Sequence, residues 1–383
     1  MEQESVFGPP GRFDDELKNV CAIDPPIRTS RPPTRGIVEV ASGIDALYLS
    51  GRVVLTKQFL ERLEHLRAEA VVLEVALAFD LGGVSMQLQP HAFGKYRFCL
   101  DHPFGRIGLT ASDQLPAIRV QPRAEFLHGQ GPRGTVEWFR ELLEVAFGPV
   151  LLSVSRVDLF GDFQGWGLKG DHRQEFLSQA RERNLHEDGE EFNGLQFGLR
   201  GSGTICARLY DKTIESAKTG SAYWKDIWGV AFDPEQPVLR VEFEIARAAL
   251  RQFGLNTPDE VLDATGALWG YLTSKWLLHR VVSSDGTKSR WPVSKQWEAI
   301  RRARVGEDDW GIARMYDGKG RGLLNNLLPS LVGYLASFGA LTKSSSFAEI
   351  VPTLSDCLAQ FAQDTDRTLG DRITEKDRKN ALP

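Results

Sequence analysis

The spacing of apolar residues changes along the chain and predicts where helices and strands form. From Phe59 to Leu66 apolar residues recur at intervals of three and four, so we expect an amphipathic helix with Thr56 as its N-cap. A second helix is expected to begin at Thr135 and to end at Gly148. By contrast, residues 37–55 mix β-branched and aromatic residues with glycine at two turn positions, which is typical of a strand pair.

The middle of the chain is rich in short apolar runs. From about Val84 to His128 these runs are interrupted by Gly, Pro and Asp, which suits antiparallel strands joined by short connections. Further strands are expected in residues 151–163, 195–213 and 238–246, with a helix in residues 172–184. This region is therefore expected to be a sheet with interspersed helices.

The C-terminal part has the signals of helices. Thr257 begins one, with Pro258 at the first helical position and Glu260 completing a capping box. From there to about Ala362 the pattern is helical throughout. The whole chain is thus expected to be an α+β protein, with a mostly antiparallel central sheet flanked by helices and a helical C-terminal region.

Composition divides the chain into four parts. Residues 1–36 contain six prolines and are expected to form a flexible arm, followed by an α+β domain (37–255), the helical region (256–365) and a charged tail (366–383). No window has about twenty uninterrupted apolar residues and the start lacks the order of a signal peptide, so we expect a cytoplasmic protein with no membrane partner. The four cysteines stand far apart, which argues against a disulfide framework or a zinc site.

The charge balance is acidic overall but not everywhere. The chain has 46 Lys and Arg against 51 Asp and Glu, a net charge of -5, whereas DNA-binding proteins usually neutralise phosphates with cations. Residues 275–321 hold eleven Lys and Arg against six Asp and Glu, with Trp and Tyr interleaved. One interpretation is a DNA grip in which the rings stack on bases. The other is a helical subdomain with tryptophans in its core and solvated arginines.

Polar residues stand at regular positions in three of the expected strands. Because side chains alternate along a strand, residues two apart share a face. The sets that share a face are Arg156 and Asp158; Arg208, Tyr210 and Lys212; and Arg240, Glu242 and Glu244. The second set places a phenol between two cations, and the third combines two carboxylates with a guanidinium. Burying such groups is costly unless they are paired.

If these strands are neighbours, their acids predict a metal site. Asp158, Glu242 and Glu244 would offer hard oxygen donors suited to Mg²⁺ or Mn²⁺. Tyr210 would stand beside the ion, which would polarise a phosphodiester while nearby cations offset the charge and the tyrosine oxygen attacks. The same cations would make phenolate formation less costly. The alternative is a structural ladder of ion pairs between strands.

The same three segments resemble the Rep_trans type of replication initiation factor, found on small rolling-circle plasmids and, as mobilisation relaxases, on integrative conjugative elements. The family pattern runs R-x-D with a second Asp, then R-x-Y-[DN]-K with a trailing Glu, then R-x-E-x-E. The matching residues here are Arg156, Asp158 and Asp162; Arg208, Tyr210, Asp211, Lys212 and Glu215; and Arg240, Glu242 and Glu244. The resemblance covers roughly residues 37–305 and is strongest from Arg156 to Leu250.

The resemblance implies a metal-dependent DNA strand transferase that acts as a site-specific single-strand endonuclease, with residues 37–255 as its nicking domain. Its tyrosine becomes joined to a 5′ phosphate and leaves a 3′ hydroxyl that primes rolling-circle replication. The roles carried over are Tyr210 as nucleophile, Asp158, Glu242, Glu244 and Asp162 as metal ligands, and Lys212, Arg208 and Arg240 as phosphate contacts. The implied partners are origin or transfer-origin DNA with a hairpin, a host helicase and polymerase, and a second copy in a homodimer.

Several functions share this pattern. A relaxase that mobilises a conjugative element uses the same chemistry as a replication initiator. A non-catalytic DNA-binding protein with the same fold, and a metal-dependent nuclease that uses water, are the alternatives. Their products differ, because only attack by tyrosine leaves the protein covalently joined to DNA.

Overall fold

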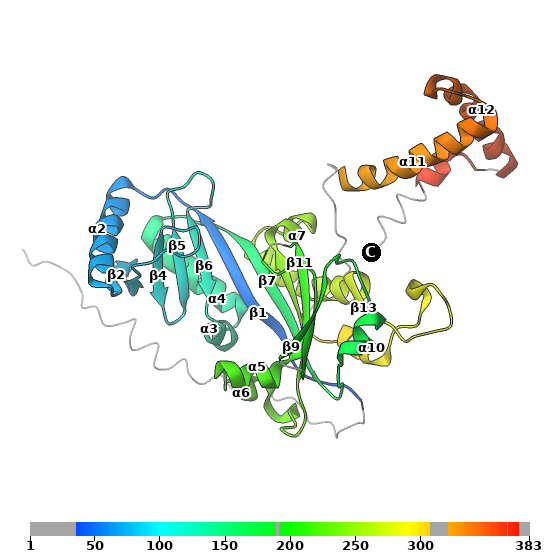
Figure 1. Ribbon diagram of the computed structural model, residues 1–383. Coiled ribbons are helices and arrows are strands. Elements are labelled where there is room, and N and C mark those ends of the chain that lie inside the picture. The colour runs from blue at the N-terminus through cyan, green and yellow to red at the C-terminus, as the bar shows by residue number, and fades with distance from the viewer. Residues whose placement is uncertain (1–35, 189–190, 202, 307–320, 366, 375–383) are drawn as a thin grey trace, which may run out of the picture.

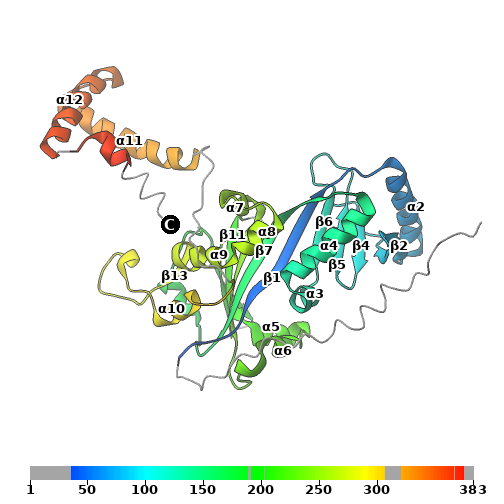
Figure 2. The same ribbon diagram turned by 180° about the vertical axis from the view of Figure 1, so that it is seen from behind.

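The structure is a computed structural model, and it describes residues 36–188, 191–201, 203–306, 321–365 and 367–374. All but one residue of the expected N-terminal arm lies outside these ranges, as do Trp310, Tyr316 and the end of the charged tail. The described residues form one large sheet with helices on both of its faces (Figures 1 and 2). The expected α+β fold with a mostly antiparallel sheet and a helical C-terminal region is confirmed.

The sheet has eleven strands, and every pairing in it is antiparallel. In chain order the strands are β1 (Val38–Arg52), β2 (Leu77–Leu81), β3 (Val84–Leu88), β4 (Phe98–His102), β5 (Gly105–Leu109), β6 (Ile118–Pro122), β7 (Leu151–Gln164), β9 (Arg183–Asp188), β10 (Glu191–Phe197), β11 (Ile205–Asp211) and β12 (Leu239–Ala246). Across the sheet the order is β2-β3-β4-β5-β6-β1-β7-β12-β11-β10-β9. The short strands β8 (Phe176–Ser178) and β13 (Leu277–His279) form a separate pair.

Strand β1 joins two halves of the sheet. It pairs with β7 along almost its whole length, with bulges that shift the register. With β6, however, it pairs only from Leu49 to Gly51. The expected strand pair in residues 37–55 is therefore wrong: Gly43 and Gly51 lie within one long bulged strand instead of at turns, because β7 offers a partner along its full length.

The helices form two layers. Their bounds are α2 (Lys57–Leu73), α3 (Ala124–Gln130), α4 (Pro132–Phe147), α5 (Lys212–Thr219), α6 (Trp224–Trp228), α7 (Arg247–Gln252), α8 (Pro258–Asp263), α9 (Thr265–Tyr271), α10 (Lys295–Arg301), α11 (Arg321–Thr342) and α12 (Phe347–Thr365), with short helical turns η2 (Gly170–Glu175), η3 (Gly229–Ala231), η4 (Leu272–Trp276) and η5 (Lys288–Arg290). One main core holds the apolar side of the sheet against α2, α4, α8 and α9. A smaller cluster under α6 lies on the other side. No helix among the described residues is both long and apolar enough to span a bilayer.

Capping signals in the sequence predicted some helices well. Thr56 accepts a hydrogen bond from the Phe59 backbone N–H at 3.3 Å and caps α2. Thr257 and Glu260 form the expected capping box at the start of α8. Helix α4 ends at Gly148 as expected, but it starts at Pro132, so Thr135 is a buried residue of its first turns and not its cap.

Two further expectations about secondary structure are wrong. Residues 172–184 form η2, β8 and the start of β9 instead of an α-helix, because β9 extends the large sheet by pairing with β10 and β8 pairs with β13 in a separate small sheet. Residues 277–294 are not helical throughout: they contain β13, and Arg280 bridges Val293. In both places tertiary pairing of the backbone outweighs the local pattern.

The close packing of the β4–β6 half can be tested at Gly105. A Cβ atom there would lie 2.7 Å from the Gln121 carbonyl oxygen and 2.8 Å from Cζ of Phe139. We expect Gly105→Ala to lower the free energy of unfolding by about 1–3 kcal/mol through overpacking, measured by urea denaturation. Gly167→Ala is the control, because nothing lies within 4 Å of the added atom. Equal stability of the two variants would contradict this packing.

Candidate functional site

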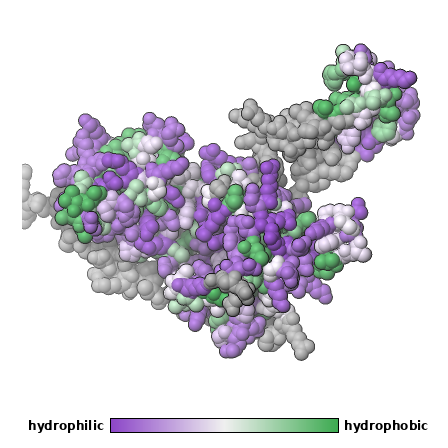
Figure 3. Space-filling model, viewed as in Figure 1, coloured by the Kyte–Doolittle hydropathy of each residue, from purple (hydrophilic) through white to green (hydrophobic). Residues whose placement is uncertain are grey.

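The three polar segments named from the sequence lie on adjacent strands. On β7, β12 and β11 most apolar residues point into the main core, and the polar residues between them point to the opposite side, together with Phe160 and Cys206. Cross-strand partners on that side are Glu244 with Asp158, Glu242 with Arg208, and Arg240 with both Asp162 and Tyr210. We call this surface the polar face. Seen from this side, hydrophilic residues predominate across the middle of the molecule (Figure 3).

Tyr210 on β11 meets a carboxylate on this face. Its hydroxyl donates a hydrogen bond to Oε2 of Glu242 at 2.9 Å. The guanidinium of Arg208 lies 5.2 Å from the centre of the tyrosine ring and also pairs with Glu242. On the other side, the partner of Tyr210 on β10 is Gly194, where an added Cβ atom would lie 2.6 Å from the Leu209 carbonyl oxygen and 3.0 Å from Cβ of Tyr210.

The surroundings of Tyr210 do not make its phenol acidic. Burial, with the charges of Glu242 and Asp45, raises the pKa of Tyr210 well above its ordinary value, although Arg240 and Arg208 act in the opposite direction. The cations named from the sequence are present, but burial and the two acids outweigh them. Tyr210 is therefore protonated at neutral pH and needs a proton acceptor before it can attack.

Asp158 and Glu244 share one cation. The guanidinium of Arg156 binds Asp158 through two nitrogens and reaches Oε2 of Glu244 at 2.9 Å. Burial raises the pKa of Asp158 to about 7, with Glu242 and Glu244 adding to the rise, although Arg156 opposes it. Asp158 is thus a buried acid that changes its charge near neutral pH.

Arg200, which the sequence did not single out, reaches the same acids. It lies in the loop between β10 and β11, and its Nε is 3.5 Å from Glu244. The backbone N–H of Gly201 in that loop donates to Oε1 of Glu244 at 2.7 Å. The glycines of the motif GLRGSG indicated a turn, but nothing in their spacing indicated that the turn folds back onto β12.

Arg240 and Asp162 form a pair with no access to solvent. Arg240 has no exposed surface, and its guanidinium binds both oxygens of Asp162 at 2.7 and 2.8 Å. The third nitrogen of the guanidinium, Nη1, donates a hydrogen bond to Oδ1 of Asp45 on β1 at 2.7 Å. The guanidinium lies between the rings of Phe160 and Trp224, at 4.2 and 3.9 Å.

This pair departs from the roles that the family resemblance implied. Arg240 has its charged nitrogens bound and buried, so in this arrangement it does not reach a phosphate. Asp162 also accepts a hydrogen bond from Nε1 of Trp228 at 2.7 Å, so its oxygens are occupied too. Asp45 was missed, although a single acid inside the apolar run IDALYL is the same kind of signal as Asp158.

Lys212 stands at the end of β11, where the strand turns into α5. Asp211 caps that helix by accepting hydrogen bonds from the N–H groups of Thr213 and Ile214. The ammonium of Lys212 is buried, lies 6.0 Å from the Tyr210 ring centre and pairs with Glu215 at 2.5 Å. Lys212 is thus beside Tyr210 as expected, but as the first residue of a helix instead of a strand position.

The arrangement does not hold a metal ion ready-made. Among the residues that the structure describes, no three Asp, Glu, His or Cys side chains lie close enough together to bind one. Asp158, Glu242 and Glu244 supply the right kind of oxygen donor, and Oε2 of Glu244 accepts no hydrogen bond. The position between Asp158 and Glu244 is taken by the guanidinium of Arg156. A metal ion fits these donors only if Arg156 moves aside.

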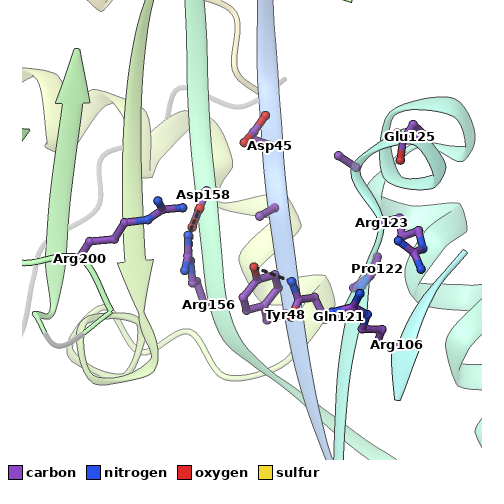
Figure 4. Close-up of a pocket in the computed structure, with 12 residues that line it drawn as sticks. Asp45, Tyr48, Arg106, Gln121, Pro122, Arg123, Glu125, Arg156, Asp158 and Arg200 are labelled. Atoms are coloured by element: carbon purple, nitrogen blue, oxygen red, sulfur yellow. Dashed lines mark hydrogen bonds and ion pairs between the residues drawn. The ribbon is translucent and has the colours of Figure 1, made fainter. Parts of the chain in front are cut away.

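An open pocket of about 380 Å³ lies next to these acids (Figure 4). The residues that line it come from β1, β5, β6, α3, β7 and the loop before β11: Asp45, Ala46, Tyr48, Arg106, Gln121, Pro122, Arg123, Ala124, Glu125, Arg156, Asp158 and Arg200. Four of them are arginines, which gives the pocket donors suited to phosphate. Arg156 lines this pocket, so it has space into which its side chain can move.

The stretch 275–321 matches the interpretation of a packed subdomain where it is described. Trp276 and Trp297 are buried in the main core, and Nε1 of Trp297 donates to the Thr273 carbonyl at 2.8 Å. Neither ring is available to stack on a base. Trp291 is half-buried, with its Nε1 bound to the Asp285 carbonyl at 2.6 Å.

No family model matches the chain, and no curated protein does. One solved structure that it resembles is a rolling circle replication initiator protein from Geobacillus stearothermophilus, with 17% sequence identity over 71% of this chain and 100% of that one. The TM-score is 0.40, which is too low to carry an argument about function.

The buried pair gives a prediction about stability. We expect Asp162→Asn to lower the free energy of unfolding by about 3–5 kcal/mol, because Arg240 keeps its charge and loses its main partner. Chemical denaturation measures this loss. The control is Glu64→Gln, which removes the exposed pair with Arg97 and should cost less than about 1 kcal/mol. Similar losses in both variants would show that Asp162 does not stabilise the fold through Arg240.

Proposed function

We propose that the chain nicks one strand of DNA by attack of Tyr210 on a phosphodiester, as a rolling-circle replication initiator or a related relaxase. The observation that carries this proposal is the hydrogen bond of 2.9 Å from the Tyr210 hydroxyl to Glu242, on a face that also carries Arg208, Asp158 and Glu244. The ordered motifs of the sequence support the same assignment.

Glu242 is suited to take the phenolic proton. The pKa of Tyr210 is raised by burial and by Glu242, so the phenol attacks efficiently only if its proton leaves in the same step. The hydrogen bond already directs that proton at Oε2 of Glu242. Arg208 pairs with Oε1 of the same carboxylate and holds it in place.

The reaction then exchanges one phosphate ester for another. The Tyr210 oxygen forms a bond to phosphorus, the bond from phosphorus to the 3′ oxygen breaks, and the phenolic proton passes to Glu242. The released 3′ oxygen takes a proton and becomes the hydroxyl that primes synthesis. Because the ester bond is conserved, the reverse reaction rejoins the strand without another energy source.

Cations of this chain would bind the charge on the phosphate. Arg208 lies beside the tyrosine, and Arg156 and Arg200 line the adjoining pocket. Lys212 adds a buried ammonium near the ring. Arg240 is better assigned to holding the strands together, because its nitrogens are bound to Asp162 and Asp45.

We also propose a divalent metal, Mg²⁺ or Mn²⁺, held by Asp158 and Glu244 with Glu242 nearby. When bound, it would polarise the scissile phosphate and offset its charge. Arg156 would leave the space between Asp158 and Glu244 and turn to the pocket that it already lines. The raised pKa of Asp158 supports this assignment, since crowded acids gain from a nearby cation.

Two alternative functions share part of this arrangement. A non-catalytic DNA-binding protein is favoured by the arginine pairing of Asp158, Glu242 and Glu244, which equally suits a structural ladder. A nuclease that uses water would need the acids but not the phenol. The nature of the DNA product separates all three.

Tyr210→Phe tests the nucleophile. The full chain is incubated with a supercoiled plasmid carrying the DNA that flanks its gene, and protein–DNA adducts are separated on a denaturing gel. We expect the wild type to form an adduct and Tyr210→Phe to lose it by at least about a thousandfold, because a missing nucleophile removes the covalent step. Tyr334→Phe, which changes an exposed phenol on α11, is the matched control and should keep the adduct.

Other results assign a different function. Nicked DNA with free 5′ phosphates and no attached protein would indicate attack by water. Binding without any nicking, in the wild type and in Tyr210→Phe alike, would indicate a non-catalytic protein. Either result would overturn the proposed chemistry.

Metal binding is tested by thermal unfolding, without reference to activity. At a concentration of Mn²⁺ one hundred times its Kd, binding should stabilise the wild type by about 2.7 kcal/mol. Glu244→Gln should abolish this effect, whereas Glu64→Gln, at an exposed acid, should keep it. Binding should tighten from pH 6 to pH 8, because the raised pKa of Asp158, about 7, lets protons compete at the lower pH. An unchanged melting temperature at every pH would rule out the proposed site.

A further inference from the structure

Aromatic rings and guanidinium groups alternate in a row that runs from the polar face at β7 over β1 and β6 to the loop before β4. The guanidinium of Arg119 on β6 lies 4.7 Å from the ring centre of Phe93 and 5.6 Å from that of Tyr48 on β1. The Tyr48 ring also has the guanidinium of Arg156 on β7 beside it, 5.0 Å from the ring centre. We call Phe93, Arg119, Tyr48 and Arg156 the stacking row.

The backbone places these residues on one side of the sheet. On β6 the buried residues Ile118 and Val120 face the main core, so Arg119 and Gln121 face the other way. Gln121 donates from Nε2 to the Tyr48 hydroxyl at 2.9 Å, which fixes the ring (Figure 4). Tyr48 and the nearby arginines stand around the open pocket in that view.

Gly108 on β5 makes room for the far end of the row. A Cβ atom at Gly108 would lie 2.9 Å from Cβ of Tyr96 and 3.0 Å from Cδ1 of Phe93. Phe93 and Tyr96 exchange backbone hydrogen bonds of 2.9 and 3.0 Å, which close the loop before β4 over that glycine. The position of Phe93 over β5 is therefore built into the fold.

The charges along the row are only partly neutralised. Arg119 is partly buried, its guanidinium packs on the rings of Phe93 and Tyr48, and no ion pair joins it to an acidic side chain of the described residues. Arg106 and Arg123, at the rim of the pocket, share the single carboxylate of Asp101, at 3.4 and 2.8 Å. This side of the pocket thus offers guanidinium groups with capacity to bind phosphate.

We propose that the stacking row binds a single-stranded segment of DNA beside the nick, with bases against its rings and guanidinium planes and phosphates on Arg119, Arg106 and Arg123. Unpaired bases expose the faces that aromatic and guanidinium groups stack on, whereas bases in a duplex do not. The row ends at Arg156, which touches Asp158 and Glu244 beside the Tyr210 site. The inference rests on the proposed function, because it assigns the path of the strand that Tyr210 cleaves.

The test measures binding of the full chain to a fluorescein-labelled dT 20-mer by anisotropy, over a range of salt concentrations. Arg119→Ala should weaken binding about tenfold or more, because it removes a stacking plane and a phosphate contact. It should also reduce the slope of log K against log salt by about 0.7, the effect of one phosphate on a single strand. Arg119→Lys should restore the slope but not the full affinity, since lysine keeps the charge and lacks the plane.

The matched control is Arg62→Ala. Like Arg119, Arg62 packs on an aromatic ring, 4.7 Å from the ring centre of Phe79, but it is more exposed and belongs to α2 on the opposite side of the sheet. Its loss should leave binding of the dT 20-mer unchanged. Equal weakening by Arg62→Ala and Arg119→Ala would show a general charge effect and overturn the stacking row.

The remaining outcomes separate this inference from the proposed function. If Arg119→Ala binds the dT 20-mer as the wild type does, the stacking row is wrong even where Tyr210 forms an adduct. If Arg119→Ala weakens binding while no adduct forms at Tyr210, the row stands as a single-strand site and the nicking proposal is wrong. An equal loss on a 20-base-pair duplex, or tighter wild-type binding of an rU 20-mer, would overturn the assignment to single-stranded DNA.

Discussion

The buried guanidinium of Arg240 is the constraint on which the polar face depends. It joins Asp162 on β7 and Asp45 on β1 to β12, under the rings of Phe160 and Trp224. A buried charge without partners is very costly, so these strands are stable only in the register that pairs it. The same register sets Glu242 opposite Arg208 and within hydrogen-bond reach of the Tyr210 hydroxyl. The group that holds the strands and the group proposed to react are thus fixed by one set of contacts.

Most of what the sequence predicts about the site follows from the alternation of side chains along strands. Because the side-chain period of a strand is two, the shared face of Glu242 and Glu244 follows directly from their spacing. The contributions of Asp45 and Arg200 do not follow, since they depend on which strand lies beside β7 and on how a loop folds back. The helix predicted for residues 172–184 is wrong for a related reason. The apolar spacing that predicted it is a local signal, whereas the pairing of β9 with β10 depends on how the chain folds.

The distribution of charge matters more than its sum. A chain with a net charge of -5 nonetheless gathers Arg106, Arg123, Arg156 and Arg200 around one pocket. Asp101 and Glu244 hold Arg106, Arg123 and Arg200 in place, so these two acids position cations that line the pocket. The stretch 275–321 is recognisably basic in the sequence because its cations lie close together along the chain. The arginines of the pocket come from four separate segments, which no count along the chain reveals.

The short pairing between β1 and β6 divides the large sheet into two halves. Within the sheet, the backbone pairing between β1 and β6 runs only from Leu49 to Gly51, while helices α3 and α4 of the β2–β6 half also contact β1 and α8. The pocket draws its walls from both halves, whereas Tyr210 and Glu242 lie within one of them. The distance from phenol to carboxylate is therefore set by strand pairing within one half, whereas the walls of the pocket depend on how both halves pack. The pair proposed to cut a strand thus lies in one half, while the row proposed to bind it extends into the other.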